Sequence, residues 1–144
     1  MIGKIVTGKS FGGAVEYVLR KEKARLLDSD GVDAESIRSI IDDFNFQRKA
    51  RREIAKVVGH ISLSFHRDDA PKLTDGRMRE LAATYMECMG IADTQYIVAR
   101  HNDTEHPHLH IIYNRVKYAG RLWRIRTNAA GTSKSANSLN ADTG

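Results

Sequence analysis

Two short segments in which polar and apolar residues alternate place the strongest limit on the fold of this chain. In residues 55–66, Ile61, Leu63 and Phe65 alternate with histidines and serines, and residues 108–116 show the same kind of pattern. A period of two is typical of a β-strand that buries one face and leaves the other in polar surroundings. Both segments are therefore predicted to be half-buried strands.

The rest of the chain predicts a mixed arrangement of strands and helices. The clearest helix follows Thr74, which can cap it, and ends at Gly90. The other expected elements are strands at 2–7 and 95–101, helices at 14–21 and from residue 33, a polar turn at 28–33 and a loop at 102–107. This order predicts an α+β fold, with a mostly antiparallel sheet covered by helices on one face.

Length and composition narrow the class of protein. A chain of 144 residues is the size of one domain. Its composition, with 41% hydrophobic and 28% charged residues, excludes a collagen-like or wholly disordered chain. No apolar run approaches the roughly 20 residues that span a bilayer, and the N-terminus lacks the layout of a secretory signal. The single cysteine, Cys88, can form no internal disulfide. We therefore expect a soluble protein of a reducing cytoplasm, without a membrane partner.

Positive charge is concentrated in two parts of the sequence. The formal net charge is +5, and residues 115–144 contain six basic residues against one acidic residue. A second basic cluster consists of Arg48, Lys49, Arg51, Arg52 and Lys56, with Glu53 among them. Basic clusters suggest a polyanionic partner such as nucleic acid, although a solvated helix face with a basic tail explains the charge equally well.

Four of the six histidines lie within residues 101–110. His108 and His110 would project side by side from a strand, with Leu109 on the opposite face. If residues 95–101 and 108–116 pair as a hairpin, His101 reaches the same place from the neighbouring strand. Three neutral imidazoles form a good site for zinc, manganese, nickel or cobalt with open positions. Although a single histidine on a strand is usually structural, this clustering predicts a metal site.

A metal with open positions can polarise a phosphoryl oxygen, and the basic surface favours a phosphate substrate. Cleavage then needs either metal-bound water or a side chain, and a tyrosine suits an enzyme that later rejoins the bond. Tyr85 belongs to the apolar stripe of a helix, and Tyr113 lies on the strand face opposite the histidines. Spacing alone does not choose between Tyr17, Tyr96 and Tyr118.

Three segments of the chain resemble the motifs of a known family. They are MIGKIVTGKSFGGAVEYVLR, GHISLSFHRDD followed by KLTDGRM, and RHNDTEHPHLHIIYNRV. In this order they resemble the first, second and third motifs of the MOB-P type relaxases, or relaxase/mobilisation nucleases, which belong to the His-hydrophobe-His superfamily of single-strand endonucleases. The resemblance covers about residues 1–120 in the right order. It implies a central antiparallel sheet flanked by helices.

Relaxases of this type nick one DNA strand at an origin of transfer and stay attached to the 5′ phosphate through a tyrosine. The resemblance implies that Tyr17 is the nucleophile, that His101, His108 and His110 hold the metal, and that Asp103 supports a ligand histidine. Asp103 could equally serve only the turn. The DNA-binding candidates are Ser62 and Ser64 on the polar strand face and the basic Arg48, Arg51, Arg52 and Arg115.

The cofactor that this resemblance implies is a divalent metal. Magnesium or manganese is expected first, and zinc, nickel or cobalt are the alternatives. The expected partners are single-stranded DNA at an origin of transfer and accessory mobilisation and coupling proteins. Residues 1–120 are expected to form the catalytic core and 121–144 a basic, then Ser/Asn/Gly-rich tail, so that the chain would be a truncated relaxase. The alternatives are a rolling-circle replication initiator, a single-tyrosine transposase, a single-stranded-DNA-binding module without turnover, and a hydrolase that uses metal-bound water.

Overall fold

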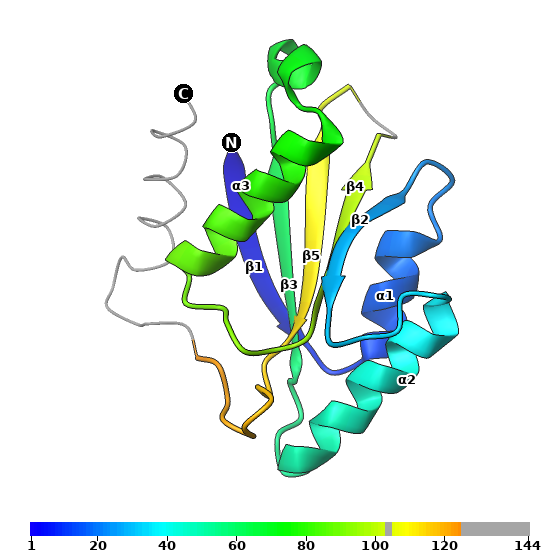
Figure 1. The fold of residues 1–144 in the computed structure, drawn as a ribbon, viewed down its shortest axis with the longest axis vertical. Coiled ribbons are helices and arrows are strands. Elements are labelled where there is room, and N and C mark those ends of the chain that lie inside the picture. Colours follow the sequence, from blue (N-terminus) through cyan, green and yellow to red (C-terminus); the bar gives the residue numbers. More distant parts are fainter. Residues whose placement is uncertain (103–104, 125–144) are drawn as a thin grey trace.

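A single antiparallel sheet of five strands forms the centre of the protein. The computed structural model describes residues 1–102 and 105–124. The strands are β1 (Ile2–Gly8), β2 (Arg25–Asp30), β3 (Val58–Ser64), β4 (Tyr96–His101) and β5 (His108–Asn114). They lie in the order β1-β3-β5-β4-β2, and every neighbouring pair is antiparallel (Figure 1). The predicted α+β class is confirmed, and the two alternating segments form the adjacent strands β3 and β5.

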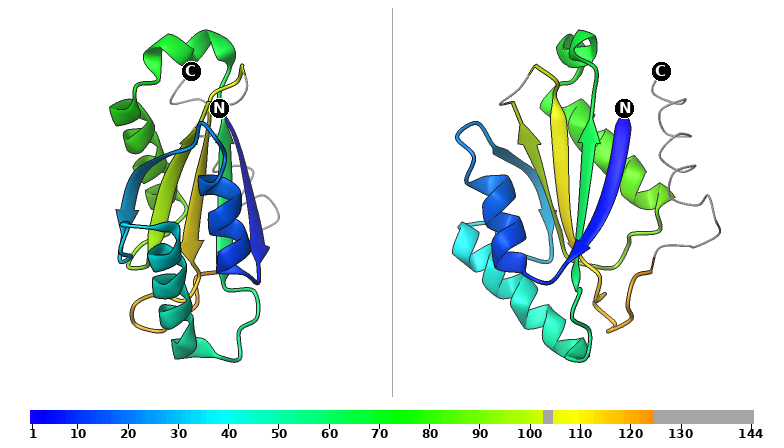
Figure 2. Two further views of the ribbon diagram at one scale, coloured as in Figure 1. Left: turned by 90° about the vertical axis from the view of Figure 1, so that its right-hand side faces the viewer. Right: turned by 180° about the vertical axis from the view of Figure 1, so that it is seen from behind.

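Helices cover both faces of this sheet. Helix α3 (Asp75–Cys88) lies on one face, whereas α1 (Phe11–Leu19) and α2 (Ile37–Arg48) lie on the other (Figures 1 and 2). The expectation that helices cover one face only is wrong. The reason is that β4 is apolar on both sides: Val98 packs into the core under α3, and Ile97 and Ala99 pack into the core under α1 and α2. The sheet therefore separates two cores.

The first half of residues 28–33, expected as a polar turn, belongs to edge strand β2, which ends at Asp30 and pairs with β4. The turn begins only at Gly31, whose φ of 69° requires the left-handed conformation that glycine tolerates. Two aspartates made the strand resemble a loop. In the structure Asp30 accepts a hydrogen bond from the Tyr118 hydroxyl at 2.9 Å, and Asp28 accepts one from the Tyr96 hydroxyl at 3.3 Å.

Capping residues decide where the helices begin. Helix α1 begins three residues earlier than expected because the Ser10 side chain accepts a hydrogen bond from the Gly13 amide at 3.0 Å, which caps the helix and draws its two glycines into the first turn. Thr74 caps α3 as predicted, through a bond from the Arg77 amide at 3.1 Å. Short 3₁₀ helices, η1 (Lys49–Arg51) and η2 (Arg67–Lys72), precede β3 and α3 respectively.

The folded unit includes residues beyond 120. Trp123 is buried in the core under α3, with its ring centroid 5.2 Å from that of Tyr113. Its indole Nε1–H donates to the carbonyl oxygen of Met89 at 3.2 Å. Residues 125–144 of the expected tail lie outside the described residues. Among the helices of the described residues, none combines the length and the apolar character needed to cross a membrane.

Candidate metal centre

The three histidines predicted to hold a metal lie together on the sheet face covered by α1. Strands β4 and β5 pair as the hairpin prediction required, with His101 opposite His108. His110 lies two residues further along β5 on the same face. Each of the three rings offers a nitrogen, and these nitrogens all lie within 4.8 Å of one another. A set of three imidazole nitrogens at this spacing fits a divalent cation.

Backbone carbonyls fix the proton position on two of these rings. His101 Nε2 lies 2.6 Å from the carbonyl oxygen of Val18 in α1, and His108 Nδ1 lies 3.0 Å from that of His106. A carbonyl oxygen can only accept, so each of these nitrogens carries the hydrogen. The lone pair is then on Nδ1 of His101 and on Nε2 of His108. Hydrogen bonds of this kind orient a metal ligand and increase its basicity.

His60 is a fourth member of the cluster, and the sequence interpretation gave it no role. Its Nε2 lies 2.8 Å from Nδ1 of His110, and the two ring centroids are 5.0 Å apart. When His110 donates its Nδ1–H to His60, its own Nε2 keeps the lone pair that a metal needs. The alternating pattern had placed His60 on the polar face of its strand. The missing information was that β3 pairs with β5.

Burial keeps two rings of this cluster, those of His110 and His60, uncharged. It lowers the pKa of His110 to about 3, and the neighbouring imidazoles, His101 first among them, add to the effect because another positive charge there would be repelled. The pKa of His60 is lowered by burial and, second, by His101. Both rings are therefore neutral at neutral pH, and the neutral imidazole is the form that binds metals.

Tyr17 is the tyrosine that the structure places beside the histidines. Its ring lies on the flank of α1, about half exposed, with its centroid 5.9 Å from that of His110 and 6.0 Å from that of His60. The Lys21 ammonium lies 4.9 Å from the same ring centroid. Helix α1 is held in place by Phe11, which stacks on a phenylalanine of α2 with ring centroids 4.6 Å apart.

The other tyrosines that spacing had left open lie elsewhere. The hydroxyls of Tyr96 and Tyr118 donate to aspartates of β2. Burial and those carboxylates raise the pKa of Tyr96, and raise that of Tyr118 to about 12, which makes both poorer nucleophiles. Tyr85 of α3 and Tyr113 of β5 are buried in the core between α3 and the sheet, as their positions in the sequence predicted.

The two candidate serines lie next to the histidines in the β3–β5 register. Ser62 is opposite His110, and Ser64 is opposite His108. Ser62 also lines a cavity of about 350 Å³ that reaches Tyr17, whereas Ser64 is exposed at the strand end. Both serines therefore neighbour histidines of the cluster across the β3–β5 pair, and their contact with DNA stays a prediction.

The candidate arginines lie at the opposite end of the sheet from the histidine cluster, around the end of α2 and the end of β5 (Figure 1). They are Arg48, Arg51, Arg52 and Arg115. Arg48 donates to the carbonyl oxygen of Lys9 at 2.9 Å, and Arg51 donates to the Glu53 carboxylate at 2.7 Å. The structure does not bring these arginines to the histidines, and their contact with DNA stays a prediction.

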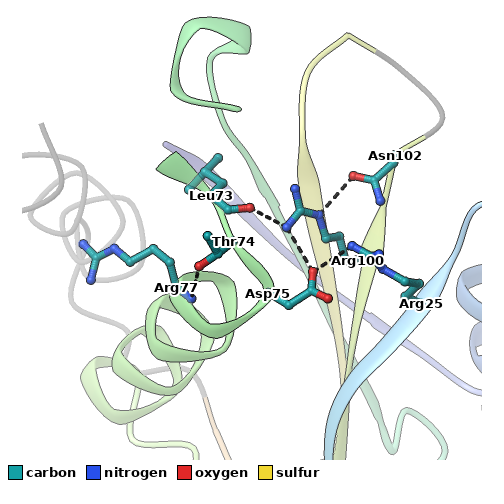
Figure 3. A network of polar contacts seen from close by, with 7 residues as sticks. All are labelled: Arg25, Leu73, Thr74, Asp75, Arg77, Arg100 and Asn102. Atoms are coloured by element: carbon teal, nitrogen blue, oxygen red, sulfur yellow. Dashed lines mark hydrogen bonds and ion pairs between the residues drawn. The ribbon is translucent and has the colours of Figure 1, made fainter. Parts of the chain in front are cut away.

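Asp103 lies outside the described residues. Next to His101, a polar network on the opposite face of the sheet holds the end of β4 (Figure 3). Arg100 donates to Asn102 Oδ1 at 3.0 Å, to the carbonyl oxygen of Leu73, and to Asp75 Oδ1 at 3.2 Å. Arg25 of β2 donates to the same Asp75 oxygen at 2.7 Å. The network ties β4, β2 and the start of α3 together immediately beside His101.

A family model described as "Relaxase: MobA/VirD2-like, nuclease domain" matches residues 17–144. The matched range begins at Tyr17, contains all six histidines and continues past residue 120, where the resemblance had been expected to end. No curated protein matches the chain.

Proposed function

Since the chain belongs to the family of MobA/VirD2-like relaxases through its nuclease domain, we propose that it nicks one DNA strand at an origin of transfer and becomes joined to the 5′ phosphate through Tyr17. One observation carries the proposal. Three histidine nitrogens lie within 4.8 Å of one another, and the ring of an exposed tyrosine lies beside them, 5.9 Å from His110 between centroids. A cation site and a nucleophile are the two parts that such a reaction requires.

His101, His108 and His110 would hold the metal, and the carbonyls behind them would keep two of the rings in the metal-binding form. When bound there, a divalent ion supplies Lewis-acid polarisation of the scissile phosphate. Magnesium or manganese is the ion we propose, with zinc, nickel and cobalt as the alternatives that the same donors would accept.

Tyr17 attacks the phosphorus with its hydroxyl oxygen. The hydroxyl gives up its proton as a bond forms between its oxygen and phosphorus, the bond from phosphorus to the 3′ oxygen breaks, and a proton is delivered to the leaving 3′ oxygen, so that no net proton is gained or lost. The Lys21 ammonium, 4.9 Å from the ring centroid, places positive charge over the phenol ring, which favours the build-up of negative charge on it. The phosphotyrosine bond conserves the energy needed to rejoin the strand.

The test is whether a covalent adduct forms on single-stranded DNA. The full chain is incubated with manganese and a library of single-stranded oligonucleotides, and adducts are detected as slower bands on a denaturing gel. Tyr17→Phe should abolish the adduct while manganese binding, measured by calorimetry, is unchanged. An adduct that persists in Tyr17→Phe excludes this nucleophile. Nicked DNA without attached protein would indicate hydrolysis by metal-bound water, and binding without cleavage would indicate a binding module.

We propose further that the reaction serves the conjugative mobilisation of a plasmid in the cytoplasm, together with accessory mobilisation and coupling proteins. The family assignment supports this setting. A rolling-circle initiator or a single-tyrosine transposase would use the same chemistry. Adducts that form on oligonucleotides from an origin of transfer, and not on those from a replication origin or a transposon end, would support mobilisation.

A further inference from the structure

A cavity of about 350 Å³ opens between edge strand β1 and helix α1, next to the histidine cluster. Beyond the histidines and the tyrosine already described, its lining consists of Lys4, Val6, Gly13, Ala14 and Ser62. None of the lining residues is acidic. The volume is at the lower end of what small-ligand sites provide and suits a ligand of nucleotide size.

Lys4 is the one lining residue with a fixed positive charge. In the register of the sheet, Lys4 of β1 is opposite Ser62 of β3, and Ser62 is opposite His110 of β5. Side chains opposite one another on neighbouring strands lie on the same face, about 5 Å apart at their Cβ atoms. An ammonium, a hydroxyl and an imidazole of the histidine cluster therefore stand in one row across the sheet.

The neighbours of Lys4 along β1 are apolar. Ile2 and Val6, its neighbours on the same face of β1, are 73% and 45% exposed. Gly13 and Ala14 add little bulk on the side of α1, which leaves the cavity open. A single cation between exposed apolar side chains suits a ligand that joins an anionic group to a flat ring whose faces can make apolar contacts, as a nucleotide does.

We propose that this cavity binds one nucleotide adjacent to the scissile phosphate, and that Lys4 and Ser62 hold the phosphate of that nucleotide while Val6 contacts its sugar or base. The inference rests on the proposed function, because it takes the substrate to be single-stranded DNA. It goes beyond that function by stating over which part of the protein surface the DNA strand runs. The DNA leaves the histidine cluster across β3 and β1 and continues along the edge of the sheet.

The experiment measures the affinity of the full chain for single-stranded DNA without cleavage. All variants carry Tyr17→Phe, and the probe is fluorescein-labelled single-stranded DNA of random sequence, titrated at several salt concentrations. Lys4→Ala should weaken binding about 10-fold, as loss of a charge-assisted hydrogen bond does, and reduce the slope of log K against log salt by about 0.7. Lys4→Arg should restore most of the affinity because it keeps the charge.

Lys72→Ala is the matched control, since Lys72 is an exposed lysine of η2 outside the cavity lining and its loss changes the net charge by the same amount. It should change the affinity less than twofold. Ala14→Leu fills the cavity without changing the charge and should weaken DNA binding while manganese affinity is retained. Equal affinities and salt slopes for Lys4→Ala and Lys72→Ala would overturn the proposal. That outcome would be distinct from failure of the proposed function, which is judged by adduct formation in the chain that retains Tyr17.

Discussion

Across the β3–β5 pair, Nε2 of His60 lies 2.8 Å from Nδ1 of His110. Only one hydrogen can lie between two neutral ring nitrogens, so the ring that donates it decides where the remaining lone pairs are. A hydrogen on His110 Nδ1 leaves His110 Nε2 free to bind a metal. A hydrogen on His60 Nε2 would block that position, because the other nitrogen of His110 would then carry its proton.

Removing the acceptor on His60 should therefore weaken metal binding. We expect His60→Leu to reduce the affinity for manganese about 10- to 100-fold, as the loss of a hydrogen-bond partner behind a metal ligand does. His60→Gln should lose less, because its amide oxygen can still accept from His110. Calorimetric titration with manganese measures both variants.

His66→Leu serves as the control for this comparison. His66 follows β3 and is exposed, and its ring accepts from the Asp68 amide at 3.1 Å outside the cluster. We expect its manganese affinity to equal that of the unmodified chain. Equal affinities for His60→Leu and His66→Leu would show that His60 does not position the ligand.

The stability of the metal-free protein should depend on pH through the buried histidines. Burial lowers the pKa of His110 from its ordinary 6.5 to about 3 and also lowers that of His60. The unfolded chain takes up protons on these rings as the pH falls below 6.5, whereas the folded His110 does not until near pH 3. The folded state then binds fewer protons, so the free energy of unfolding falls as the pH is lowered through that window.

Urea denaturation of the metal-free chain from about pH 7 to about pH 4 measures this dependence. The urea midpoint should be constant above the ordinary pKa of histidine and should decrease steadily below it. In His110→Asn the decrease should be shallower, because one of the depressed groups is gone. An unchanged pH profile in His110→Asn would contradict the low pKa.

The close contact between Gly59 and Tyr113 gives a prediction for stability. A Cβ atom at Gly59 in β3 would overlap the ring of Tyr113, which is buried under α3. Gly59→Ala must therefore displace a packed aromatic ring and should lower the free energy of unfolding by about 3 kcal/mol, at the upper end of overpacking costs. Gly8→Ala in β1 is the control, since its Cβ would lie 3.9 Å from the nearest atom. Urea denaturation should show a change of less than about 1 kcal/mol there, and equal losses in both variants would contradict the packing argument.

The histidine cluster could be predicted from the sequence because a period of two fixes which side chains share a strand face, and because only one short loop separates β4 from β5. His60 needed a pairing between strands 50 residues apart, which local patterns do not specify. Strand β2 was missed because its aspartates suggest a turn until Tyr96 and Tyr118 are seen to donate to them. The helices on the second face of the sheet were missed because the histidines at one end of β5 made that face look polar. The middle of β5 is apolar on the same face, where Ile112 packs into the core under α1 and α2.

The choice of Tyr17 shows the same limit. Its position after a short strand and a glycine-containing turn was visible in the sequence, but the distance from α1 to the histidines depends on how the helix packs. Phe11 on Phe44 and the Val18 carbonyl on His101 set that distance. Packing of this kind follows from the complete core, and spacing along the chain does not reveal it.

The last prediction concerns Arg100, whose guanidinium is nearly buried and holds the end of β4 from the face opposite His101 (Figure 3). Arg100→Met leaves the carbonyl oxygen of Leu73 without this donor and removes the bond to Asn102. We expect the free energy of unfolding to fall by about 1–3 kcal/mol, the cost of leaving such groups unsatisfied. Because His101 adjoins Arg100 in β4, manganese affinity should fall as well.

Arg25→Met is the matched control for Arg100→Met. Arg25 binds the same Asp75 oxygen, but both partners of that ion pair are substantially exposed. Loss of Arg25 should therefore lower the free energy of unfolding by less than about 1 kcal/mol and leave manganese affinity unchanged. Urea denaturation and calorimetry on the two variants separate these effects, and equal manganese affinities would show that the Arg100 network stabilises the fold without positioning the histidine.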